Sequence, residues 1–215
     1  MEENAGGAAG LSRKERERER HRRAVLEAAE KVFSTRGYHA ATIQEIAGLA
    51  EFSVGALYNM FAGKEDLYRR LVELRVEEFL GEVEERLEQA GDARGKVRAV
   101  LETKLEFFNR RKDFFRIFAH VASGEGGSGP PPPSRACLEM LQSYEERLVD
   151  AVAAGVREGV FADRDPWLVV LCLEGMTNAI VGRWIHTGDD QLDRVDPDRL
   201  EEIVMHGIMA EGAGE

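Results

Sequence analysis

The stretch that most constrains the fold of this chain runs from Thr42 to Lys64, where two short helices and a tight turn are predicted. Thr42 and Glu45 have the spacing of a capping box, in which each side chain accepts from a backbone N–H at the helix start. Apolar residues then recur at helical spacing: Ile43, Ile46, Ala47 and Ala50. Ser53 suits the N-cap of a second helix over 54–61. The spacing therefore predicts a helix-turn-helix.

Two residues of this stretch indicate a partner rather than a packed core. Gly55 lies inside the second short helix, where glycine costs about 0.5–1 kcal/mol relative to alanine, so we expect another molecule to approach closely there. Lys64 opens the next helix, where a positive charge is unfavourable but a bound phosphate would be stabilised. A plain solvated lysine is the alternative for Lys64. A helix-turn-helix of this kind is typical of proteins that read the DNA major groove.

Composition and charge favour an all-α protein with one basic end. The 215 residues are 43% hydrophobic with only six prolines, and runs of alternating β-branched residues are absent. Residues 1–64 hold 10 Lys and Arg against 9 Asp and Glu, whereas residues 65–215 hold 19 against 31. The net charge of −11 is thus concentrated in the second part of the chain. Such a distribution suits a protein that meets DNA with its N-terminal part only.

Caps, glycines and apolar stripes predict about nine helices in two domains. The expected division is a disordered tail over 1–11, a DNA-binding domain over 12–63 and a ligand-binding and dimerisation domain over 64–215, with a flexible Gly/Pro loop at 124–134. The predicted helices are 12–37, 42–50, 54–61, 64–89, 93–111, 113–121, 136–158, 166–185 and 197–210. At the start of the first helix, alternating charges indicate either a solvated extension or a basic arm reaching DNA; the arm would use Arg13, Lys14, Arg16, Arg20 and Arg23.

The helix over 166–185 is apolar nearly all round, which predicts burial on two sides. One face would enter the core and the other a partner subunit, so we expect a homodimer through this helix and the helix over 197–210. A fully internal helix in a monomer is the alternative.

Several other functional classes lack support in the sequence. No nucleophile-elbow, P-loop, zinc-protease or dinucleotide-binding motif occurs, and no histidine has a glutamate three residues before it, as a di-iron site would need. We therefore expect no enzyme, no cofactor and no metal site. Cys137 and Cys172 lack CxxC spacing, and no signal peptide or uninterrupted apolar run of about 18 residues occurs, so we expect reduced thiols in a cytoplasmic protein. A helical scaffold protein is a further alternative.

Over 42–67 the chain resembles the TetR family of transcriptional regulators. The matching positions are Thr42, Ile46, Ala47, Ala50, Ser53, Gly55, Leu57, Tyr58, Phe61, Lys64, Glu65 and Leu67. Two positions depart from the family pattern: Glu51 stands where a turn glycine is usual, and Phe52 where a valine is usual. The resemblance implies a two-domain, all-helical homodimer, most often a repressor, that binds a palindromic DNA operator and is released by a small, partly apolar ligand.

The resemblance also implies roles for individual residues. Thr42, Ser53, Tyr58 and Lys64 would contact DNA phosphates, Gly55 would allow close approach, and Val54, Ala56 and Asn59 would face base edges. The ligand would lie among helices of the second domain; candidate contacts are Phe79, Phe107, Phe108, Phe115, Phe118, Met140, Leu171, Glu174, Met176, Asn178 and Trp184. For each phenylalanine, plain core packing is the alternative, and Glu174 and Asn178 could instead pair across the dimer.

Overall fold

The computed structural model describes residues 12–122, 130–187 and 195–208, and these form helices and connecting segments without a strand. The predicted all-α class is therefore confirmed. The predicted tail at 1–11, most of the Gly/Pro loop at 124–134 and the end of the last helix lie outside the described residues.

The N-terminal helices form a small head whose starts are fixed by side-chain caps. Helix α1 (Arg13–Ala40) begins with a capping box between Ser12 and Glu15, and α2 (Ile43–Leu49) begins with the predicted box between Thr42 and Glu45. Helix α3 (Val54–Met60) is capped by Ser53. The predicted stop at Gly37 is present as a kink, with φ of 73°, after which α1 continues for one more turn.

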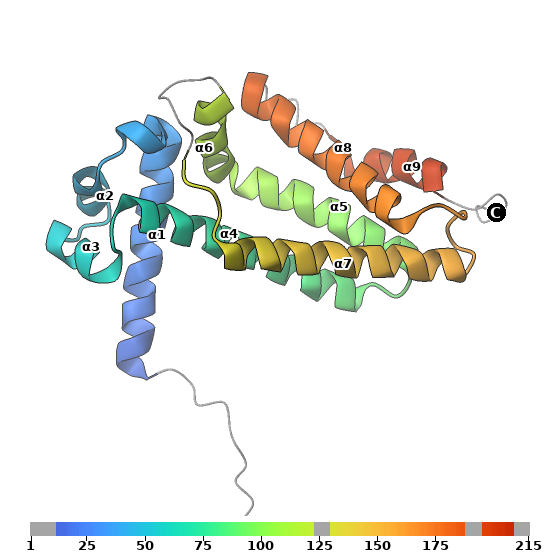
Figure 1. The fold of residues 1–215 in the computed structure, drawn as a ribbon, viewed down its shortest axis with the longest axis horizontal. Helices are drawn as coiled ribbons and strands as arrows, with labels where there is room; N and C mark the ends of the chain where they lie inside the picture. Colours follow the sequence, from blue (N-terminus) through green and yellow to red (C-terminus); the bar gives the residue numbers. More distant parts are fainter. Residues whose placement is uncertain (1–11, 123–129, 188–194, 209–215) are drawn as a thin grey trace, which may run out of the picture.

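The remaining helices form an elongated body (Figure 1). They are α4 (Lys64–Gln89), α5 (Ala93–Arg110), α6 (Lys112–Ala122), α7 (Arg135–Arg157), α8 (Pro166–Thr187) and α9 (Pro197–Ile208). Apart from the predicted end of the last helix, which lies outside the described residues, their bounds agree with the predicted ranges to within about two residues, the usual uncertainty of helix ends. Helix α4 starts at the head and runs into this body. The beginning of α1 projects well beyond the head (Figure 1).

The described residues form two large hydrophobic cores and a small cluster around Phe108 and Trp184. The core of the head joins α1–α4 but also takes Phe114 and Ile117 from α6 and Cys137 from α7. The core of the body joins α4, α5, α7, α8 and α9. Because α6 packs directly against α1, a helix of the second domain is part of the head's core.

Helix α8 leaves a large apolar surface uncovered in a single chain. Trp167, Leu168 and Leu171 are about half exposed, and Ile203 of α9 is 66% exposed. A cavity of about 370 Å³ lies between the two helices. Among the described helices, α8 is long and apolar enough to span a membrane, a test that core helices of soluble proteins also pass, and 28% of its most apolar window is buried.

Candidate DNA-binding surface and ligand cavity

The turn between α2 and α3 is held by local hydrogen bonds. The hydroxyl of Thr42 accepts from the Glu45 N–H at 3.2 Å and donates to the Glu45 carboxylate at 2.9 Å. The Glu45 carboxylate also accepts from the Thr42 N–H at 3.0 Å. The bonds that this carboxylate accepts from the Thr42 hydroxyl and from the Thr42 N–H lower the pKa of Glu45. The hydroxyl of Ser53 accepts from the Ala56 N–H at 3.1 Å. Thr42 and Ser53, two of the four residues expected to contact phosphate, therefore serve as helix caps within the chain.

Glu51, which departs from the family pattern, adopts a left-handed backbone conformation with φ of 60°. Glycine adopts this conformation without strain, whereas a residue with a Cβ atom pays about 1–2 kcal/mol. The turn thus has the geometry that the usual glycine provides, although its residue is glutamate. Phe52 packs partly on the head's core, and its ring lies 5.2 Å from that of His21.

The outward face of α3 carries three of the residues expected to contact DNA: Gly55, Tyr58 and Asn59. Leu57 is buried in the head, while Tyr58 is 56% exposed and Asn59 is exposed beside it. Gly55 is exposed too, and a Cβ atom built there would meet nothing within 4 Å. The packing of the chain itself therefore does not require glycine at 55. Val54 and Ala56 are half-buried, and Val54 also packs against the head's core.

Lys64 has partners within the chain that the sequence did not reveal. Its ammonium donates to the carbonyl oxygens of Tyr38, His39 and Ala41, at 2.9, 3.0 and 3.1 Å. These carbonyls belong to the end of α1, where a positive charge is favourable. Burial lowers the pKa of Lys64. The lysine therefore ties the start of α4 to the end of α1, and its predicted phosphate contact stays a prediction.

Arg22 is a structural residue of the head that sequence reasoning missed. Its guanidinium donates to the carbonyl of Met60 at 2.6 Å and lies 5.3 Å from the ring of Phe61. Arg22, on α1, thereby provides a hydrogen-bond donor for the last carbonyl of α3. A run of alternating charges gave no signal for this contact, because its partner lies 38 residues away.

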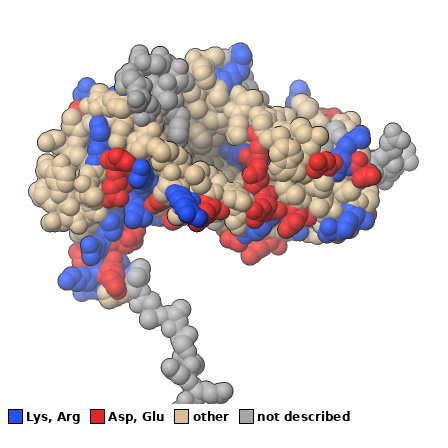
Figure 2. Space-filling model, in the orientation of Figure 1, with Lys and Arg blue, Asp and Glu red and all other residues tan. Residues whose placement is uncertain are grey.

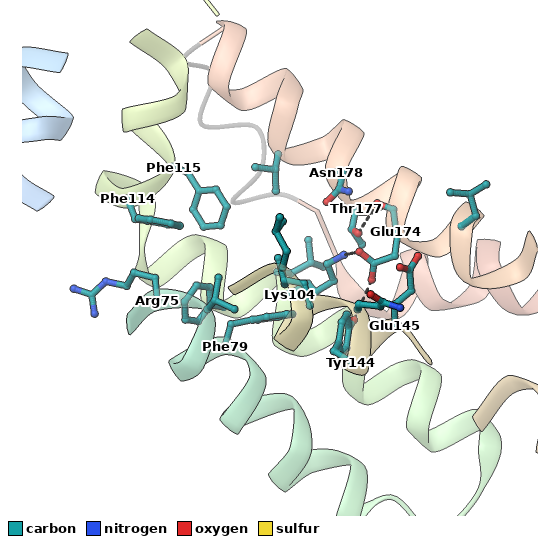
Figure 3. A pocket seen from close by; sticks show the side chains of 18 residues that line it. Arg75, Phe79, Lys104, Phe114, Phe115, Tyr144, Glu145, Glu174, Thr177 and Asn178 are labelled. Atoms are coloured by element: carbon teal, nitrogen blue, oxygen red, sulfur yellow. Dashed lines mark hydrogen bonds and ion pairs between the residues drawn. The ribbon is translucent and has the colours of Figure 1, made fainter. Parts of the chain in front are cut away.

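A cavity of about 620 Å³ lies in the body, lined by α4, α5, α6, α7 and α8 (Figure 3). Figure 2 shows a hollow on the corresponding face of the molecule. The lining is mostly apolar with a few polar groups, as in pockets for small ligands. The cavity lies at the predicted place, among the helices of the second domain.

Six of the expected ligand contacts line this cavity: Phe79, Phe107, Phe115, Leu171, Glu174 and Asn178. Phe108 and Trp184 pack against each other elsewhere, Met140 packs on the head's core, and Met176 lines the cavity between α8 and α9. The side chain of Phe118 lies outside the described residues. Several lining residues were missed, among them Arg75, Lys104, Phe114, Tyr144, Glu145 and Thr177. Ligand contact by any of these stays a prediction.

Three polar side chains meet at one side of the cavity (Figure 3). Lys104 of α5 donates to Glu174 of α8 at 2.5 Å, and the hydroxyl of Tyr144 from α7 donates to the other oxygen of the same carboxylate at 3.0 Å. Burial lowers the pKa of Lys104, an effect that the charge of Glu174 opposes. Burial also raises the pKa of Tyr144, so the phenol keeps its proton. Both oxygens of Glu174 are thus occupied.

Arg75 joins the cavity to the head. It lines the cavity from α4 and is only 2% exposed, and its Nε donates to Glu30 of α1 at 2.7 Å. Its Nη1 donates to Glu78 at 2.7 Å, and Glu78 also accepts from Arg111 at 2.9 Å. This partly buried network connects the head to the body beside the cavity.

Comparisons with known proteins agree with this architecture. The chain is 34% identical over 100 residues to the transcriptional activator FasR of Mycolicibacterium smegmatis, which is 46% of each protein. It is 25% identical over 190 residues to the transcriptional repressor KstR2 of Rhodococcus jostii, covering 86% of this chain and 89% of KstR2. The solved structure of FadR from Bacillus subtilis with stearoyl-CoA superposes with a TM-score of 0.66 at 22% identity, covering 86% of this chain and 95% of FadR.

The family comparison covers both parts of the chain. Residues 25–71 match the bacterial regulatory proteins of the tetR family, and residues 90–207 match the tetracyclin repressor-like C-terminal domain. The second match alone spans more than half of the chain. Together with the helix-turn-helix and the nine helices of the described residues, these matches identify the chain as a transcriptional regulator of the TetR family.

Proposed function

We propose that this regulator is a repressor that binds a palindromic operator as a homodimer and leaves it when a small, partly apolar ligand enters the body. The observation that carries the DNA part is the exposed face of α3, where Gly55, Tyr58 and Asn59 lie together. Gly55 has open space around it within the chain, so its cost in a helix is accounted for by a close partner. The phosphate backbone is that partner, with Asn59 available to adenine.

The dimer part of the proposal rests on α8 and α9. Their exposed apolar side chains are contiguous with the cavity between them, and a second copy of the chain would cover both. A symmetric dimer would place its two recognition helices about 34–36 Å apart, in successive major grooves. Operator palindromy follows from that symmetry. A DNA-binding role places the protein in the cytoplasm, and it requires no catalysis.

The ligand part rests on the cavity and its connection to the head. A volume of about 620 Å³ with an apolar lining suits a molecule with an acyl chain, and the similar FadR was solved with stearoyl-CoA. Helix α6 lines the cavity through Phe114 and Phe115, while Phe114 also belongs to the head's core. A ligand that displaces α6 or α4 would therefore shift α1 and the distance between the two heads.

The proposed regulator represses transcription rather than activating it. KstR2, a repressor, matches most of this chain, whereas FasR, an activator, matches about half of it. We favour repression because a dimer whose heads separate on ligand binding loses DNA by geometry alone.

A gel shift on DNA upstream of the protein's own gene tests the proposal. The wild-type dimer is expected to retard this DNA, and Tyr58→Phe and Asn59→Ala are expected to weaken binding without changing the thermal melting temperature. Addition of an acyl-CoA is expected to release the DNA. Binding that is equal for all three proteins would contradict the assigned face of α3, and tighter binding with ligand would contradict repression by release.

A further inference from the structure

The described cations that line the ligand cavity, Arg75 and Lys104, are already paired with carboxylates before any ligand enters. Lys104 is paired with Glu174, and Arg75 is paired with Glu30 and Glu78. Among the lining residues that the structure describes, each cation thus has a carboxylate partner. A ligand carrying a negative charge into this cavity would find no unpaired cation to compensate it.

We infer that the cavity selects a ligand whose buried polar group is an uncharged carbonyl on an apolar chain, as in an ester or thioester, and that Glu174 excludes the free carboxylate. This inference rests on the proposed function, since it concerns the ligand of the same cavity. It adds the chemistry of the buried group, which neither the family nor the volume determines.

The geometry of the Lys104–Glu174 ion pair explains why the cavity would accept a neutral carbonyl and exclude a free carboxylate. An ammonium has three N–H donors, and in the described part of the chain Lys104 gives one of them to Glu174. A remaining donor can bind a carbonyl oxygen without breaking the ion pair. A free carboxylate would instead compete with Glu174 for the same ammonium, while Tyr144 holds Glu174 in place. Two carboxylates would then share one cation inside an apolar cavity, where like charges are poorly screened.

The variant Glu174→Gln tests whether the charge of Glu174, rather than the shape of the cavity, selects the ligand. The amide keeps the size of the side chain and can still accept from Tyr144, but it leaves Lys104 as an uncompensated cation. The variant is therefore expected to prefer a carboxylate ligand. Glu145→Gln is the matched control, because Glu145 lines the same cavity without a hydrogen bond to Lys104 in the described structure.

The test measures displacement of the neutral dye Nile red from the full-length protein at neutral pH by methyl laurate and by laurate. Wild type is expected to bind the ester at least tenfold more tightly, or about 1.4 kcal/mol. Glu174→Gln is expected to reverse the order, and Glu145→Gln is expected to keep it. Tighter binding of laurate by wild type, or an unchanged order in Glu174→Gln, would overturn this inference alone. Binding of neither compound to wild type would overturn it together with the ligand part of the proposed function, while the gel shift would still test the DNA part.

Discussion

At residue 51 the chain carries glutamate where its backbone is left-handed, and this residue had no explanation from sequence. The φ of 60° shows that the turn requires the conformation that glycine adopts freely. The family's usual glycine and this glutamate therefore share one backbone conformation, which is strained for glutamate because of its Cβ atom. The same residue also brings one negative charge close to the proposed DNA surface.

Replacing this glutamate with glycine is expected to stabilise the head. Glu51→Gly removes the left-handed strain, which outweighs the greater freedom of glycine in the unfolded chain, so the free energy of unfolding should rise by about 0.5–1 kcal/mol. Urea unfolding followed by circular dichroism measures this change. Glu51→Gln removes the charge but keeps the strain and should leave stability within about 0.5 kcal/mol. Equal stabilisation by both variants would assign the cost to charge instead.

Lys64 can be tested for its two roles at once. Lys64→Ala deprives three carbonyls of α1 of a charged donor, so the free energy of unfolding should fall by about 1.5–3 kcal/mol. If the lysine is structural only, the dependence of operator affinity on salt should keep its slope. A direct phosphate contact would instead lower the slope of log K against log salt by about 1. Denaturant unfolding and fluorescence anisotropy over a salt series provide the two readouts.

At the scale of helices, local signals predicted where the three helices α1, α2 and α3 begin. The boxes Ser12–Glu15 and Thr42–Glu45 and the cap Ser53 join residues three apart, so a short stretch of sequence contains the complete interaction. Packing between helices was not predictable in this way. Lys104 resembles a solvated lysine of an amphipathic helix, because its partner Glu174 lies 70 residues away. The contact of α6 with α1 likewise depends on how the chain folds back, which periodicity does not encode.

The buried pair Arg75–Glu30 joins α4 to α1. Variants of this pair should show whether it contributes to the stability of the fold, to the effect of ligand on DNA binding, or to both. Arg75→Met leaves Glu30 buried without a partner and should cost about 3–5 kcal/mol of unfolding free energy. The double variant with Glu30→Gln should recover much of that loss. It should still bind operator DNA but respond less to ligand. A double-mutant cycle by urea unfolding checks the first expectation, and anisotropy titrations with and without ligand check the second.

At the scale of the whole molecule, the exposed faces of α8 and α9 predict a dimer. Leu168→Glu should give a monomer in multi-angle light scattering and weaken operator binding, because it places a charge in the proposed seam. Cys172 lies exposed on the same helix, so its thiol should react faster with a maleimide in this variant than in wild type. Leu138→Glu, at an exposed position of α7, is the control and should remain dimeric. A dimeric Leu168→Glu would place the seam elsewhere.

The central claim is that two copies of α3 read a palindrome. Selection of bound duplexes from a random DNA pool by the full-length protein tests it most directly. The expected result is an enriched inverted repeat with half-sites about one helical turn apart, and Asn59→Ala should relax the choice of base at one position in each half-site. Enrichment of no sequence, or of a single unrepeated half-site, would contradict the claim.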